Sequence, residues 1–189
     1  MSCGFLYPEG VLDMAIKINT EKRIFTLETK HTMYQMQADT YGVLRHLWYG
    51  AKTGCDMSYL QDSPDVGFSG NPHDAGNDRT YSLDTLPLEY AGAGIGDFRV
   101  PAVEAVHADG SCALDLRYYS HAVKQGKYAI AGLPALYAGE DEAETLEVVL
   151  RDTASAVEVT LKYGVLPELD VVTRCAEIRN LGEAPVTRS

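Results

Sequence analysis

Hydrophobic and polar residues alternate with a period of two over much of this chain. In residues 145–151 and 156–163, every second side chain is apolar and the side chains between them are mostly polar. This spacing is typical of a β-strand with one buried face and one exposed face. The short polar segment 152–155 lies between the two runs, so they are predicted to form neighbouring antiparallel strands.

Further segments have the same strand-like character, and none shows the spacing of an amphipathic helix. The predicted strands cover residues 23–28, 33–37, 43–49, 99–107, 114–123 and 171–179. Short strands separated by closely spaced turn signals are the pattern of an all-β protein. We therefore predict an antiparallel β-sandwich.

Two segments depart from the alternation. Residues 1–13 contain Pro8 and Gly10 and show no period, so they are predicted to be a disordered extension, with Met14 as an alternative start. Residues 50–78 are rich in Gly, Asp, Asn, Ser and Pro. A non-periodic loop of that length inside a compact domain is usually either functional or disordered. It is therefore the first place to look for a binding site.

The C-terminal end continues the strand pattern. Residues 176–186 are interpreted as the end of one strand, a turn and the start of another, and the sequence then ends at Ser189. A sandwich that ends there leaves a strand edge unpaired. We therefore expect residues 14–189 to be a β-sandwich domain that is incomplete at its C-terminus and belongs to a longer protein.

Acidic residues outnumber basic residues by 27 to 16, and the formal net charge is −11. Such a chain repels phosphate backbones, so no nucleic-acid partner is expected. No run approaches the ~18 apolar residues that a membrane helix needs, and the first residues lack the features of a secretory signal. No membrane partner is therefore expected. Without a signal, the four cysteines are expected to be reduced thiols in the cytoplasm.

Two motifs invite a chemical interpretation, and each has a simpler one. The glycines of the segment 92–96 do not match the G-x-G-x-x-G spacing of a dinucleotide loop, so a turn with positive φ is the preferred interpretation. The second motif is the loop set Asp62, Asp65, His73, Asp74 and Asp78. These residues could hold a hard cation, but they lack the spacing of a calcium loop and are better interpreted as solvated charges. No metal and no cofactor are predicted.

Histidine and aromatic residues in the strand-like runs have structural interpretations as well. His46 and His121 are expected to be hydrogen-bonded structural residues. Trp48 and Tyr49 stand at the mouth of the long loop, where aromatic faces could stack on a sugar ring or line a subunit contact. The preferred interpretation of Trp48 is a side chain in the sandwich core.

A series of ordered motifs resembles the N-terminal domain of glycoside hydrolase family 36 α-galactosidases (melibiases). The motifs are YSLDTLP (81–87), EY (89–90), GDFRVP (96–101), DLRYYSH (115–121), GLPALY (132–137), EAETLE (142–147), VEVTL (157–161) and DVVTR (170–174). They extend over nearly the whole chain after residue 13. The resemblance implies a β-supersandwich that is followed, in the family, by a catalytic (β/α)₈ barrel and a C-terminal β-domain.

Enzymes of this family hydrolyse terminal α-galactosides, such as melibiose and raffinose, with retention of configuration. Retention requires two carboxyl groups about 5 Å apart, and in the family both belong to barrel aspartates. A barrel of that kind needs about 250 residues, and this chain has 189. The resemblance therefore implies that no residue of this chain is catalytic.

The resemblance also implies a substrate contact. Many family members are homotetramers in which the N-terminal domain reaches the active site of a neighbouring subunit, and residues 65–69, 71–72 and 78–80 match the stretch that does so. The aspartate corresponding to Asp65 contacts sugar there, and a carboxylate accepts strong hydrogen bonds from sugar hydroxyls. Arg79 could donate to the sugar or form an internal salt bridge. The match between residues 50 and 65 is loose, which leaves the role of Asp56 open.

These inferences lead to one hypothesis and one alternative. The hypothesis is the substrate-contacting and oligomerisation domain of a retaining α-galactosidase, which is inactive without its barrel. The alternative is a stand-alone carbohydrate-binding or assembly module with no enzymatic parent. A reading frame that continues into a barrel with two aspartates favours the first, and a stable domain that ends in a true stop favours the second.

Overall fold

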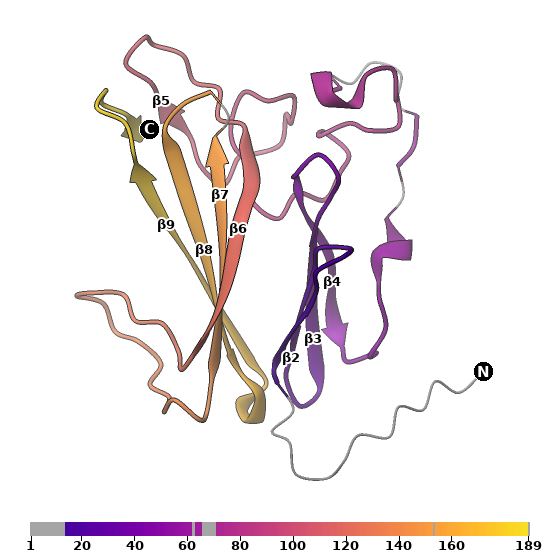
Figure 1. Ribbon diagram of the computed structural model, residues 1–189, viewed down its shortest axis with the longest axis vertical. Helices are drawn as coiled ribbons and strands as arrows, with labels where there is room; N and C mark the ends of the chain where they lie inside the picture. Colours follow the sequence, from indigo (N-terminus) through magenta and orange to yellow (C-terminus); the bar gives the residue numbers. More distant parts are fainter. Residues whose placement is uncertain (1–13, 62, 66–70, 153, 189) are drawn as a thin grey trace.

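Two four-stranded antiparallel sheets stand side by side in the computed structural model of the chain (Figure 1). The structure describes residues 14–61, 63–65, 71–152 and 154–188. One sheet has the strand order β1-β2-β3-β4 and the other β6-β7-β8-β9, while β5 pairs with β10 in a short ribbon. The strands are β1 (Ile16–Asn19), β2 (Ile24–Glu28), β3 (Thr32–Ala38), β4 (Leu44–Ala51), β5 (Ala105–Val106), β6 (Leu116–Gln125), β7 (Glu144–Asp152), β8 (Val157–Leu166), β9 (Val171–Asn180) and β10 (Thr187–Arg188).

The predicted all-β sandwich is confirmed, and most predicted strands are present within two or three residues at each end. β7 and β8 pair in antiparallel register, as the polar connection between their runs predicts. The sequence pattern missed β1, whose short run lies directly after the uncertain start of the domain. The predicted extension at residues 1–13 lies outside the described residues.

The strand predicted at residues 99–107 is wrong except for the two residues of β5 and a single β-bridge between Val103 and Gly92. Arg99 explains why this segment forms a loop. Its guanidinium donates to the carbonyl oxygens of Leu83 at 2.8 Å and Leu86 at 2.7 Å, and also to the carboxylate of Asp97. These bonds fix the backbone in a turn that leaves Phe98 and Val100 exposed to solvent. An alternating pattern does not make a strand where no partner strand lies beside it.

The core lies between the two sheets because each sheet turns one apolar face inward. Phe25 and Leu27 of β2 pack toward alternate residues of the second sheet, among them Val148 and Leu161, and all four are fully buried. Alternate residues along β8 and in the middle of β7 are apolar and enter this core. The two-residue period read from the sequence is therefore the period of the buried face.

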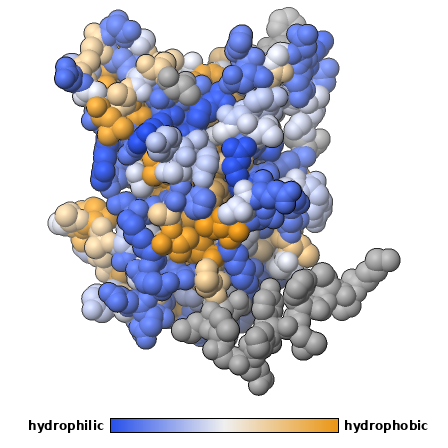
Figure 2. Space-filling model, viewed as in Figure 1, coloured by the Kyte–Doolittle hydropathy of each residue, from blue (hydrophilic) through white to orange (hydrophobic). Residues whose placement is uncertain are grey.

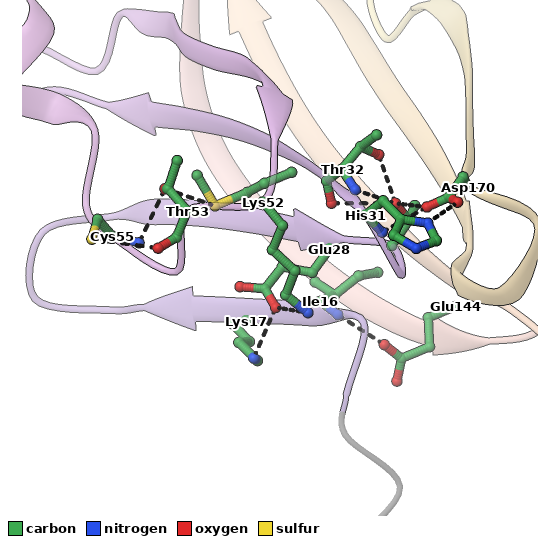
Figure 3. Close-up of polar contacts among 12 residues, drawn as sticks. Ile16, Lys17, Glu28, His31, Thr32, Lys52, Thr53, Cys55, Glu144 and Asp170 are labelled. Atoms are coloured by element: carbon green, nitrogen blue, oxygen red, sulfur yellow. Dashed lines mark hydrogen bonds and ion pairs between the residues drawn. The ribbon is translucent and has the colours of Figure 1, made fainter. Parts of the chain in front are cut away.

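Asp170 connects the two sheets at their lower ends in Figure 1. It lies between the 3-10 turn η3 (Pro167–Leu169) and the start of β9. Its carboxylate lies 2.6 Å from His31 Nδ1 and accepts hydrogen bonds from the His31 amide and the Thr29 hydroxyl at 2.7 and 2.8 Å (Figure 3). The His31 side chain and these donors lower the pKa of Asp170 to about 2. The β2–β3 turn and the β8–β9 turn are thus held together by one acidic side chain.

Candidate functional site

The long loop that the sequence singled out connects β4 to the second half of the chain. It contains two 3-10 turns, η1 (Ser58–Leu60) and η2 (His73–Ala75). Its second half is anchored by a small apolar cluster apart from the main core, which includes Ala75 and Tyr81. The Tyr81 hydroxyl donates to Asp39 at 2.5 Å, and burial with this hydrogen bond raises the pKa of Tyr81. The second half of the loop is therefore held against the domain by buried contacts.

Asp65 and Arg79 lie at two separate points of this loop, and its fold brings their side chains together. Arg79 Nη2 lies 3.2 Å from Asp65 Oδ1, and the two side chains are 62% and 54% exposed. The internal salt bridge that the sequence left open for Arg79 is therefore present. A surface pair of this kind contributes only about 0–1 kcal/mol, so sugar hydroxyls can compete for both groups. The arrangement offers an acceptor and a donor to a polar ligand.

The backbone around Arg79 is held by its neighbours. The Asn71 side-chain amide donates to the carbonyl oxygen of Asp78 at 2.6 Å. The Asp78 carboxylate accepts from the Thr80 amide at 2.9 Å and from the Thr80 hydroxyl at 2.6 Å, and these two hydrogen bonds lower the pKa of Asp78. The residues on both sides of Arg79, Asp78 and Thr80, are therefore held by hydrogen bonds.

The acidic residues of the loop have protein partners. Asp74 lies 3.6 Å from Arg117 of β6, and no group of three metal-ligating side chains occurs within the ranges that the structure describes. Asp62 lies outside those ranges. Asp56, whose role the sequence left open, pairs with Lys22 at 2.8 Å, and this hydrogen bond chiefly lowers the pKa of Asp56 to about 2. Asp56 ties the start of the loop to the β1–β2 turn.

Trp48 is not in the core, so the preferred interpretation of this residue is wrong. Its side chain is half-buried, and the indole donates to the Ala51 carbonyl oxygen at 3.3 Å. A bulge explains the difference, because Leu47 has no partner in the β3–β4 register and enters the interior in place of Trp48. Tyr49 and Tyr59 are exposed near the beginning of the loop. His121 is hydrogen-bonded, as predicted, to the Tyr118 hydroxyl at 2.6 Å.

A buried polar centre around Glu89 was missed from sequence. The carboxylate is 1% exposed and receives hydrogen bonds from Tyr34 and Tyr163 at 2.6 and 2.8 Å. His46 Nδ1 and Arg174 Nη1 both lie 3.1 Å from its oxygens. Burial acts to raise the pKa of Glu89, but the His46, Arg174 and tyrosine contacts outweigh it and lower the pKa.

The Glu89 centre joins the two sheets. Tyr34 and His46 belong to β3 and β4, whereas Tyr163 and Arg174 belong to β8 and β9. Each of these donors is paired inside the domain, which indicates a structural centre and not a ligand site. An acidic residue directly after the apolar segment 86–88 was the one signal that could have drawn attention to it.

A groove of about 870 Å³ opens between the lower ends of the sheets, away from Asp65 and Arg79. Figure 3 shows several of its polar residues. Glu28 accepts from Lys17 at 3.1 Å and from Lys52 at 2.7 Å, and Glu144 accepts from the Ile16 amide at 3.0 Å. Because Glu28 and Glu144 are buried as well as paired, whereas Asp65 and Arg79 are more than half exposed, the loop remains the stronger candidate.

The fold and the loop define the class of protein: an all-β domain of two antiparallel sheets with an exposed polar loop. The comparison with known proteins identifies the family. Residues 42–187 match the model of the glycosyl hydrolase family 36 N-terminal domain. The chain belongs to this family. No helix among the described residues has the length and apolar character needed to cross a membrane.

Curated relatives agree with this assignment. The chain is 52% identical over 174 residues to the bifunctional alpha-galactosidase/sucrose kinase AgaSK of Mediterraneibacter gnavus, and 92% of this chain and 19% of that protein are covered. It is 41% identical over 172 residues to the alpha-galactosidase AgaA of Geobacillus stearothermophilus, with 89% and 23% covered. The chain thus spans about a fifth of the length of these relatives.

Solved structures show the same fold. The galactosidase domain of AgaSK superimposes with a TM-score of 0.90 at 51% identity, over 92% of this chain and 24% of that one. A variant of AgaA from Geobacillus stearothermophilus in complex with raffinose gives a TM-score of 0.81 at 39% identity, over 86% and 23%. The supersandwich implied by the sequence motifs is therefore the fold of this region in α-galactosidases.

Proposed function

We propose that this chain is the N-terminal substrate-contacting and oligomerisation domain of a retaining α-galactosidase acting on terminal α-galactosides of the melibiose and raffinose type. The observation that carries the proposal is the family match over residues 42–187, together with relatives that are alpha-galactosidases and about four to five times as long. The parent protein is proposed to be a homotetramer, and the catalytic carboxyl groups are proposed to lie outside these 189 residues.

Asp65 and Arg79 are the residues proposed to contact the galactoside. Their side chains are more than half exposed, and they lie 3.2 Å apart on a loop fixed at both sides of Arg79. Sugar hydroxyls both donate and accept hydrogen bonds, so a carboxylate beside a guanidinium suits a pair of adjacent hydroxyls. The complex of AgaA with raffinose supports the choice of ligand class.

The chain by itself is expected to have no α-galactosidase activity, because the two carboxyl groups that retention requires are proposed to lie in a barrel outside these 189 residues. Release of nitrophenol from an aryl α-galactoside measures this directly, with a full-length α-galactosidase as the positive control. Turnover by the purified 189-residue chain would contradict the proposal and favour a catalytic pair within this domain.

Asp65→Ala in the longer enzyme is expected to raise KM for raffinose about ten- to hundredfold, since a hydrogen bond to a charged group contributes about 1.5–3 kcal/mol. The fold should be unaffected because the Asp65 side chain is 54% exposed. Asp74→Ala is the matched control: it removes another exposed carboxylate that faces an arginine in the same loop, and KM should stay the same. Equal KM values for both variants and wild type would exclude Asp65.

A further inference from the structure

The segment that carries Arg79 is a tight turn, and Tyr81 closes it. The Tyr81 amide donates to the carbonyl oxygen of Asp78 at 3.3 Å, so residues 78–81 form a four-residue turn in which Arg79 is the second residue. The two ends of so short a turn limit the backbone between them. The direction in which the Arg79 side chain leaves the loop therefore depends on where Tyr81 is held.

The Tyr81 side chain points from the loop into the domain. Tyr81 is 8% exposed, although the side chain of Arg79 two residues earlier is 62% exposed. Its ring lies edge-on to the ring of Tyr41, with the centroids 4.6 Å apart, and its hydroxyl donates to Asp39 Oδ2 at 2.5 Å. Burial and this hydrogen bond raise the pKa of Tyr81, so the phenol keeps its proton and acts as the donor.

Asp39, which accepts this hydrogen bond, is itself fixed in the turn between β3 and β4. Its side chain is buried, and its Oδ1 atom accepts from the amides of Tyr41 and Val43, both at 2.9 Å. The carbonyl oxygen of Gly42 in the same turn accepts from the Tyr118 amide of β6 at 2.7 Å. The phenol of the loop is therefore anchored to a turn that is bonded in its own right to the second sheet.

Asn71 holds the other end of the Arg79 turn. Its side-chain amide donates at 2.6 Å to the carbonyl oxygen of Asp78, the same oxygen that accepts from the Tyr81 amide. A carbonyl oxygen has two lone pairs and can accept both donors. The Asn71 hydrogen bond is exposed at the surface, in contrast to the buried bond of Tyr81. The turn is thus held once from the surface of the loop and once from the interior of the domain.

The surface around this turn is polar. Residues 77–80 are all exposed and all have polar side chains. In Figure 2 the upper right region, where Figure 1 places the loop, is largely blue. Hydrogen bonds are therefore the main contacts that this part of the loop offers to a ligand. They require donor and acceptor atoms to lie within a few tenths of an ångström of their best distance, so a small shift of the Arg79 guanidinium weakens them.

We propose that Tyr81 and Asn71 are positioning residues for the galactoside contact, and that both act through Arg79. The turn that they hold directs the Arg79 guanidinium to its place beside Asp65, where the pair offers one donor and one acceptor to adjacent sugar hydroxyls. Tyr81 and Asn71 themselves do not contact the sugar. This inference rests on the proposed function, because it assigns a role in the same site.

Kinetics of the longer enzyme with raffinose test the proposal. Tyr81→Phe removes the hydroxyl but keeps the ring that packs against Tyr41, and Asn71→Ala removes the exposed amide. Each change is expected to raise KM about threefold to tenfold, because a misplaced guanidinium makes a weaker hydrogen bond to the sugar. The value of kcat should stay the same, since only substrate binding is affected.

Tyr163→Phe is the matched control for Tyr81→Phe. It also removes a buried hydroxyl that donates to a buried carboxylate, that of Glu89 at 2.8 Å, but Tyr163 belongs to β8 and not to the loop. KM should therefore stay the same. An equal rise of KM in both variants would mean that any loss of buried hydrogen bonding impairs binding, and would overturn the positioning role of Tyr81.

The Arg79→Ala background tests whether Tyr81 acts through Arg79. If it does, Tyr81→Phe adds no further rise of KM in this background, whereas the effects of independent residues combine in full. A full additional rise would overturn the proposal. Should Tyr81→Phe lose the folded circular dichroism signal, Asn71→Ala with the same background decides, because its hydrogen bond lies at the surface.

Asp65→Ala and Arg79→Ala separate failure of this inference from failure of the proposed function. If both raise KM while Tyr81→Phe and Asn71→Ala leave it unchanged, the galactoside contact stands and the positioning role is wrong. If neither raises KM, the galactoside contact itself is wrong and the positioning role is overturned with it.

Discussion

Replacing Glu89 by alanine should lower the free energy of unfolding by about 3–5 kcal/mol, the cost of removing one partner from a buried ion pair. The Arg174 guanidinium and the hydroxyls of Tyr34 and Tyr163 would lose their common acceptor. Each donor that stays buried without a partner adds its own desolvation cost. Urea unfolding followed by circular dichroism measures the effect.

Glu89→Gln separates the charge of this side chain from its shape. The amide keeps an acceptor oxygen, so a smaller loss of about 1–2 kcal/mol is expected. The pKa of Glu89 is lowered from its usual 4.5 in the folded chain. Its charge therefore stabilises the fold above about pH 4.5, and this contribution is lost as the pH falls through the folded pKa. The stability difference between wild type and Glu89→Gln should be constant from about pH 5 to 7 and shrink in more acidic solution. A difference that grows on acidification would contradict a lowered pKa.

Gly92→Ala should destabilise the domain by about 3 kcal/mol or more, at the upper end of the usual cost of overpacking. A Cβ atom at this buried position would lie 2.0 Å from the carbonyl oxygen of Leu114. That oxygen belongs to the backbone, and the Leu114 amide next to it is bonded to Ala93 at 2.9 Å, so it cannot move aside easily. In a domain of this size the unfolding midpoint should fall by roughly 6–12 °C.

Gly110→Ala is the matched control for this substitution. Gly110 has a φ of +83°, and a Cβ there would meet nothing within 4 Å, so only the backbone cost of about 1–2 kcal/mol is expected. Calorimetry of both variants compares the loss of stability caused by steric crowding at position 92 with the loss caused by positive φ at position 110. If Gly110→Ala is the more damaging change, close backbone approach is not the reason for a glycine at position 92.

The glycine-rich segment shows how far local sequence reasoning extends. The preferred interpretation, a turn with positive φ, is right for Gly94 and Gly96, at +74° and +96°. It is incomplete for Gly92, which does not have positive φ and is required by contact with residue 114. Positive φ follows from the chain's own stereochemistry, whereas a close approach depends on which distant segment arrives there.

The candidate site shows the same difference between what the local sequence indicates and what only contacts between distant segments determine. Sequence motifs indicated Asp65 and Arg79, but only the folded loop shows them 3.2 Å apart. The Glu89 centre could not be assembled from sequence, because its four partners come from two sheets and lie 43 to 85 residues away. The contact of Asp65 with sugar, the tetramer and the cytoplasmic location stay predictions.

The sequence by itself determined the all-β class, most strands and the family. A strand with one buried face requires alternating side chains, so that information is local to each segment. Only the tertiary structure decided that most of residues 99–107 form a loop and that Leu47 replaces Trp48 in the interior. Each of these depends on whether a partner backbone lies alongside, and hydrogen-bond pairing between distant segments leaves no periodic trace in either one.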